Sequence, residues 1–87
     1  MGNYRVVLTS SAEKELGNLS ARLIARILAC LADLTSKPRP TGCRKLKGGD
    51  AEWRIRVGDY RVVYTINDAI LLVEVTRIRH RSEVYRR

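Results

Sequence analysis

The chain has 87 residues, enough for one small domain, and 17 Lys and Arg against 9 Asp and Glu give it a formal net charge of +8. No apolar run approaches the roughly 20 residues that span a bilayer, and two cysteines and one histidine are too few for a disulfide framework or a structural zinc site. We therefore expect a single basic domain over residues 1–87 with a polyanionic partner, and a cytoplasmic location because the N-terminus carries no apolar signal segment.

The first forty residues predict one strand followed by a helical hairpin. Residues 4–9 are rich in β-branched and aromatic side chains, which is typical of a strand. The Ser-x-x-Glu spacing of Ser10 and Glu13 has the form of a capping box and predicts a short helix that ends near Gly17. Ser20 then predicts the N-cap of a longer helix, whose apolar residues recur every three or four positions until a proline-containing segment stops it.

In the second half of the chain the hydrophobic period changes from that of a helix to that of strands. Apolar and other side chains alternate over residues 53–57 and 60–66, on either side of Gly58-Asp59, which predicts a two-residue turn of the II′ type. Asn67-Asp68 predicts a second turn before the apolar run 70–75. The order β-α-α-β-β-β predicts an α+β fold, a small, mostly antiparallel sheet with the helical hairpin packed on one face.

The Gly58-Asp59 turn also predicts which residues of the hairpin face each other. It places Trp53 opposite Tyr64 on an apolar face, where we expect packing against the helices rather than base stacking. It places Arg56 opposite Arg61 on the other face. Like charges in direct register destabilise a sheet by up to about 1 kcal/mol, so the pair favours a bound anion such as phosphate; a solvated charged face is the alternative.

Three segments then occur in a fixed order, Leu46-Lys47-Gly48, residues 53–64 and residues 79–85. In this order and spacing they resemble the RelE toxins of bacterial and archaeal toxin–antitoxin systems, within the RelE/ParE superfamily, and the resemblance covers nearly the whole chain. It implies a ribosome-dependent endoribonuclease that cleaves mRNA in the ribosomal A site, inhibits translation and is neutralised by a cognate acidic, RelB-like antitoxin. It places the working residues of the family on Arg54, Arg56, Arg61, Arg79 and Tyr85.

The composition favours RNA over DNA as the substrate. Hydrolysis of DNA usually relies on water activated by metal ions that clustered carboxylates hold, and the acidic residues of this chain are scattered. RNA carries its own nucleophile, the 2′-OH, and its cleavage requires a proton acceptor, a proton donor and stabilisation of charge, but no metal or cofactor. We predict metal-independent cleavage to a 2′,3′-cyclic phosphate, with Arg61 and Arg79 holding the scissile phosphate and Arg56 assisting.

The general base stays open between Tyr85 and His80. Two strand positions that can be lysine in the family are Arg54 and Arg56 here, and arginine remains protonated. Strand alternation also puts Arg79 on the core-facing side, so a β-bulge or the end of the sheet must reorient it if it joins this site. Further RNA-binding residues are expected at Arg44, Lys45, Lys47, Arg81, Arg86 and Arg87.

Three alternatives remain: a ParE-like toxin of the same fold, a basic module that only binds nucleic acid, and a degenerate toxin that binds its antitoxin but has no activity. A ParE-like toxin would bind DNA gyrase and cut no RNA, whereas the dense arginine set with Tyr85 is what an RNA-cleaving surface requires. A basic module that only binds nucleic acid would show salt-dependent binding without cleavage.

Overall fold

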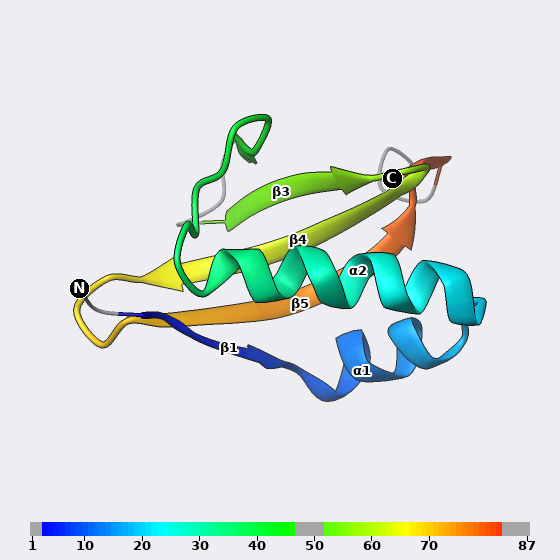
Figure 1. Cartoon of the computed structure of the whole chain (residues 1–87), viewed down its shortest axis with the longest axis horizontal. Coiled ribbons are helices and arrows are strands. Elements are labelled where there is room, and N and C mark those ends of the chain that lie inside the picture. Colours follow the sequence, from blue (N-terminus) through cyan, green and yellow to red (C-terminus); the bar gives the residue numbers. More distant parts are fainter. Residues whose placement is uncertain (1–2, 47–51, 83–87) are drawn as a thin grey trace.

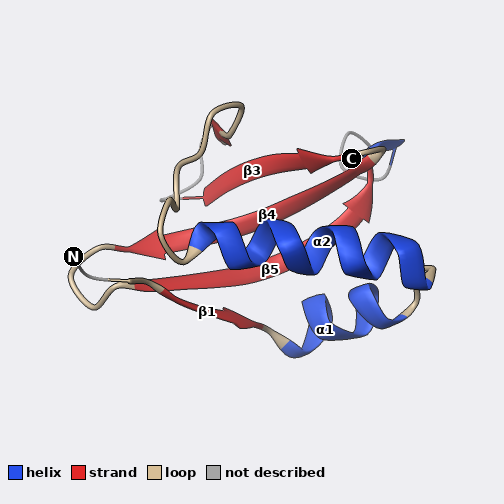
Figure 2. Cartoon of the chain, in the orientation of Figure 1, coloured by secondary structure: helices blue, strands red, loops and turns tan. Residues whose placement is uncertain are grey.

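The computed structural model describes residues 3–46 and 52–82. In chain order the elements are β1 (Arg5–Leu8), α1 (Ser10–Gly17), α2 (Ala21–Leu34), β2 (Arg44–Lys45), β3 (Glu52–Val57), β4 (Tyr60–Asn67) and β5 (Leu72–His80). The α+β class is confirmed, and the observed order differs from the predicted one only by the two-residue strand β2 (Figure 2). Within the described ranges, no helix has the length and apolar character needed to cross a membrane.

The strands form one sheet in the order β1-β5-β4-β3-β2. β1 runs parallel to β5, and the other neighbouring strands are antiparallel. Both α1 and α2 lie on the same side of this sheet, and α2 crosses over β4 and β5 (Figure 1). We call this side the helix face and the opposite side the outer face.

Polar side chains cap both helices at their N-termini. The Oγ1 of Thr9 accepts a hydrogen bond from the backbone N–H of Ala12 at 3.2 Å, which makes Thr9 the N-cap of α1. The predicted cap at Ser10 is therefore wrong by one residue, because Thr9 still has the extended backbone of β1 and Ser10 is already helical. Ser20 caps α2 as predicted, and its Oγ accepts from the N–H of Leu23 at 3.2 Å.

The hydrophobic core lies between the helices and the helix face of the sheet. Tyr64 is fully buried there and donates a hydrogen bond to the carbonyl oxygen of Pro38 at 2.9 Å, and burial raises the pKa of its phenol. Trp53 packs against the edge of this core, with the guanidinium carbon of Arg39 5.3 Å from its ring centroid. The predicted packing role of both aromatic residues is confirmed. The other fully buried large side chains are Ile27, Leu34, Val62, Val73, Val75 and Ile78.

The β3–β4 hairpin has the register that its turn predicts. Val57 pairs with Tyr60, and Arg56 pairs with Arg61. Gly58 has a φ of +60°, the left-handed conformation that the first central residue of a II′ turn requires and that glycine adopts without a steric cost.

The β4–β5 connection differs from its prediction. β4 continues through Asn67, and the turn comprises residues 68–71 instead of Asn67-Asp68. The Oδ1 of Asn67 accepts hydrogen bonds from the backbone N–H groups of Ala69 at 3.0 Å and Ile70 at 3.3 Å. This side-chain acceptor stabilises the longer turn, and Ile70, which the pattern placed in a strand, is 64% exposed.

Candidate functional site

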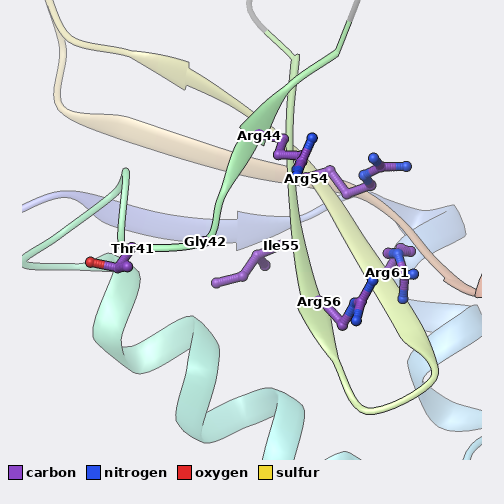
Figure 3. Close-up of a pocket in the computed structure, with 7 residues that line it drawn as sticks. All are labelled: Thr41, Gly42, Arg44, Arg54, Ile55, Arg56 and Arg61. Atoms are coloured by element: carbon purple, nitrogen blue, oxygen red, sulfur yellow. The ribbon is translucent and has the colours of Figure 1, made fainter.

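Three arginines lie side by side across the outer face. Arg61 on β4 pairs with Arg56 of β3 on one side and with Arg79 of β5 on the other. Residues in register on neighbouring strands share one face, so these three residues form a line that we call the arginine row. In Figure 3, Arg56 and Arg61 project from the opposite side of the sheet to Ile55, which packs against the core.

A β-bulge in β5 turns the last arginines of that strand to the outer face. Val63 and Tyr64 are consecutive on β4, but their partners on β5, Arg77 and Val75, are not, so Thr76 has no counterpart. The Oγ1 of Thr76 donates a hydrogen bond to the carbonyl oxygen of Val63 at 3.2 Å within the bulge. One extra residue shifts the alternation of side chains by one position, which supplies the reorientation that the sequence pattern required.

The arginine row is anchored at both its centre and its β5 end. Arg61 is only 4% exposed, and its Nη1 donates to the carbonyl oxygen of Tyr60 at 3.4 Å. The Nε of Arg79 donates to Oε2 of Glu15 on α1 at 2.7 Å. The Oε1 of Glu15 accepts from the backbone N–H of Ile78, also at 2.7 Å. One carboxylate of α1 therefore fixes both the backbone of β5 and the side chain of its catalytic candidate.

A depression of about 640 Å³ opens beside the arginine row (Figure 3). It lies where β2 ends and leaves part of the edge of β3 uncovered. None of its lining residues is acidic and four are arginines, so its walls attract anions. The lining residues are Thr41, Gly42, Arg44, Arg54, Ile55, Arg56 and Arg61.

His80 lies apart from the arginine row. It pairs with Tyr60, and the two rings meet edge to face with centroids 5.4 Å apart. Tyr60 alternates with Arg61 along β4, so this ring pair faces the helix side of the sheet. The Nδ1 of His80 also lies 3.0 Å from the Oγ of Ser82.

The other predicted site residues fall partly outside the described ranges. Arg54 lies on the outer face, two residues along β3 from Arg56, and Arg44 lies next to it on β2. Lys45 and Arg81 are exposed. The residues that lie outside the described ranges are Lys47, Tyr85, Arg86 and Arg87.

Known proteins resemble this chain along almost its whole length. The family described as ParE toxin of type II toxin-antitoxin system, parDE, matches residues 6–85. The toxin RelG of Mycobacterium tuberculosis is 31% identical over 85 residues, which cover 97% of this chain and 98% of RelG. The chain belongs to the RelE/ParE toxin superfamily. It is the toxin of a toxin–antitoxin system.

Two further relatives of the toxin agree with this placement. The toxin RelE of Mycobacterium tuberculosis is 32% identical over 84 residues, covering 95% of this chain and 87% of RelE. In the crystal structure of the archaeal RelE–RelB complex from Pyrococcus horikoshii OT3, one chain matches with a TM-score of 0.82 and 28% identity, covering 91% of this toxin and 96% of that chain.

Two residues of the toxin's site are not singled out by the sequence pattern. Glu15 holds Arg79 from 64 positions away, and no local spacing marks such a contact. Arg77 shares the outer face with Arg79 because both follow the bulge. The available signal was charge at positions 77 and 79, where an otherwise apolar strand should face the core.

A polar cluster fastens the segment that leads to β2 of the toxin. Arg39 donates to both carboxylate oxygens of Asp68, at 2.8 and 3.4 Å, and the hydroxyl of Tyr4 donates to Oδ1 of Asp68 at 2.6 Å. The hydrogen bond from Arg39, reinforced by that from Tyr4, lowers the pKa of Asp68. The cluster thereby joins the residue before β1, the β4–β5 turn and the loop that precedes Arg44 and the cationic depression.

The Asp68 cluster makes the stability of the toxin depend on pH. A carboxyl whose folded pKa is lowered stabilises the fold above its unfolded pKa of about 3.9, and this stabilisation is lost as the pH falls through the folded pKa. We expect Asp68→Asn to lower the melting temperature slightly at pH 5 to 8 and the difference from wild type to disappear under strongly acidic conditions. Thermal melts across this range check it, and a difference independent of pH would contradict it.

Proposed function

We propose that this toxin is a ribosome-dependent endoribonuclease that cleaves mRNA in the ribosomal A site and thereby inhibits translation in the cytoplasm. The observation that carries the proposal is the arginine row, three arginines in register across β3, β4 and β5. Repulsion between like charges in a sheet is offset by an anion that lies between them, and a phosphate fits this requirement. The names of the relatives, toxins RelG and RelE, support the same function.

The proposed reaction is metal-independent attack by the RNA itself. The 2′-oxygen bonds to the adjacent phosphorus and loses its proton to a base, while the bond to the 5′-oxygen breaks and that oxygen takes a proton from solvent. The products are a 2′,3′-cyclic phosphate and a 5′-hydroxyl. Arg61 and Arg79 hold the phosphate and stabilise its growing negative charge, and Arg56 assists from β3.

We propose that the oxygen of Tyr85, in its phenolate form, accepts the proton of the 2′-hydroxyl. Arg54 and Arg56 keep their protons at neutral pH, so neither serves as a base. His80 is the other candidate from the sequence, and its pairing with Tyr60 on the helix side argues against it. The assignment of Tyr85 rests on the family resemblance, and Tyr85→Phe, which removes only the hydroxyl, is the substitution that tests it.

We further propose that a RelB-like antitoxin neutralises the toxin. The similar chain from Pyrococcus horikoshii was solved in complex with RelB. A net charge of +8 and the arginine row favour a partner that supplies an acidic segment. An adjacent reading frame that encodes a short acidic protein, and rescue of growth when that protein is expressed with the toxin, would support this pairing.

The match to the ParE family favours a second function, binding of DNA gyrase without cleavage of RNA. The two functions differ in what stops first after the toxin is induced. A nuclease of the proposed kind halts translation and leaves DNA supercoiling unchanged, whereas a gyrase inhibitor changes supercoiling before translation fails.

Induction followed by mapping of RNA ends tests the proposed function. We expect new 5′ ends within codons of a translated message and none in the same message when its start codon is removed. Plasmid supercoiling is measured in the same cells as the control for the gyrase alternative. Intact message together with relaxed plasmid DNA would overturn the nuclease proposal.

A further inference from the structure

A second pair of arginines lies on the outer face, beside the arginine row. Arg44 of β2 pairs with Arg54 of β3, and Arg54 is two residues along its strand from Arg56. Side chains two residues apart on a strand point to the same side and are separated by about 6.6 Å. This separation is close to that of successive phosphates along a polynucleotide strand, so a scissile phosphate that also contacts Arg56 would bring the neighbouring phosphate to Arg54.

The depression joins the second pair to the arginine row. Arg44 and Arg54 line one part of it, and Arg56 and Arg61 line another. Figure 3 shows the side chains of Arg54, Arg56 and Arg61 on one side of the hairpin, with Arg44 beside Arg54. Anions at the two positions would lie in one continuous cavity, and each would reduce the repulsion of an opposed arginine pair.

Strand β2 presents Arg44 to this cavity. It is only two residues long, and its other residue, Lys45, pairs with Trp53 and so faces the helix side. Arg44 is exposed, so its guanidinium can reach a ligand in the depression and bind phosphate through two N–H groups. The RNA contact expected at Arg44 therefore lies in the depression, next to Arg54.

We propose that Arg44 and Arg54 form a second phosphate subsite, which holds the phosphate next to the scissile one, so that the RNA strand runs along β3. The proposal rests on the proposed function, because that function places the scissile phosphate on the arginine row. It predicts that the affinity for RNA depends on a second phosphate that lies at Arg44 and Arg54, and not only on the total positive charge of the toxin.

The test compares short RNAs that carry one or two phosphates. Wild-type toxin, Arg44→Ala, Arg44→Lys and Arg22→Ala are titrated by NMR with a 2′-O-methyl dinucleotide, which has one internal phosphate, and a 2′-O-methyl trinucleotide, which has two. Arg22 is an exposed arginine on α2, away from the outer face, and is the control for loss of one charge. The NMR spectra also show whether each variant is folded.

We expect the trinucleotide to bind wild type and Arg22→Ala more tightly than the dinucleotide does. The logarithm of the association constant falls linearly with the logarithm of the salt concentration, and this slope should be steeper by about 0.7 for the trinucleotide. That is the difference expected for one extra phosphate contact on a single strand. Both gains should disappear in Arg44→Ala, and Arg44→Lys should recover part of them. Equal affinity of the two RNAs for wild type, an undiminished gain in Arg44→Ala, or the same loss in Arg22→Ala would overturn the subsite.

This test does not depend on cleavage, because the 2′-O-methyl group blocks the nucleophile. If the affinity pattern is as expected but wild type cuts no message on ribosomes, the subsite stands and the nuclease assignment fails. If wild type cuts message and the second phosphate adds affinity without Arg44, the subsite alone is wrong.

Discussion

Replacement of Arg61 by alanine should slow cleavage of message on ribosomes by about 10²- to 10³-fold, the usual cost of losing one preorganised donor to a developing negative charge. Arg61 is at the centre of the arginine row and is held at 4% exposure between Arg56 and Arg79. At such low exposure its interaction with a phosphate is weakly screened by water. The rate is measured by single-turnover cleavage of a defined message on programmed ribosomes.

Two further variants separate chemistry from folding in this experiment. Arg61→Lys keeps the charge but loses the planar two-pronged geometry, so it should lie between wild type and Arg61→Ala. Arg22→Ala removes one charge from α2 and should cut at the wild-type rate. A folded Arg61→Ala protein, as judged by its thermal melt, that retains full cleavage would remove Arg61 from the proposed mechanism.

Replacement of Glu15 by glutamine should reduce the maximal cleavage rate by about tenfold, the effect of about 1.4 kcal/mol on the barrier, while leaving the fold nearly as stable as wild type. A glutamine oxygen can still accept the hydrogen bond from the N–H of Ile78. Its amide nitrogen, however, would face the Nε–H of Arg79, so two donors would meet and Arg79 would lose its fixed orientation. The expected result would identify Glu15 as a positioning residue for Arg79.

Glu15→Ala extends the comparison, because it removes both contacts. A part-buried backbone N–H at the edge of β5 would lose its acceptor, at a cost of about 1–3 kcal/mol in the free energy of unfolding. Glu13→Gln, an exposed change on the same helix, is the matched control. If Glu15→Gln loses stability but not maximal rate, Glu15 is merely structural.

The part of the sheet that residues close in the sequence determine could be predicted well. Gly58-Asp59 sets the hairpin register because a two-residue turn leaves one way to pair the strands, and the Arg56–Arg61 pair follows from counting outward from that turn. Local sequence also determines α2, because Ser20 marks its N-terminus and its apolar residues recur with the period of a helix. Local sequence patterns are therefore sufficient to predict the β3 and β4 side of the candidate site.

The remainder depends on contacts between distant parts of the chain. The bulge at Thr76 forms because β5 must pair with β4 and bury Ile78 at the same time, and no residue type signals it alone. Strand β2 is too short to have a period, and its position comes from pairing with β3. The Glu15–Arg79 contact links α1 to the last strand. These three features bring Arg79 and Arg44 to the outer face or hold them there.

The fold concentrates part of the positive charge of the chain on the outer face of the sheet. A formal charge of +8 indicates a polyanionic partner without saying where it binds. The sheet gathers arginines from β2, β3, β4 and β5 on the side away from the helices. Those of β2, β3 and β4 line one depression of about 640 Å³. We infer that the surplus charge serves a site with two phosphate positions within a broader attractive surface.

In the proposed reaction, the 2′-hydroxyl of the substrate attacks the neighbouring phosphate. The most direct measurement uses a message with one 2′-deoxy nucleotide immediately before the mapped cleavage site, on programmed ribosomes, with analysis of the product ends. We predict a 2′,3′-cyclic phosphate from the all-ribose message and no cut at that site in the deoxy message. Cleavage of the deoxy message at the same rate, or a 3′-hydroxyl product end, would contradict this account.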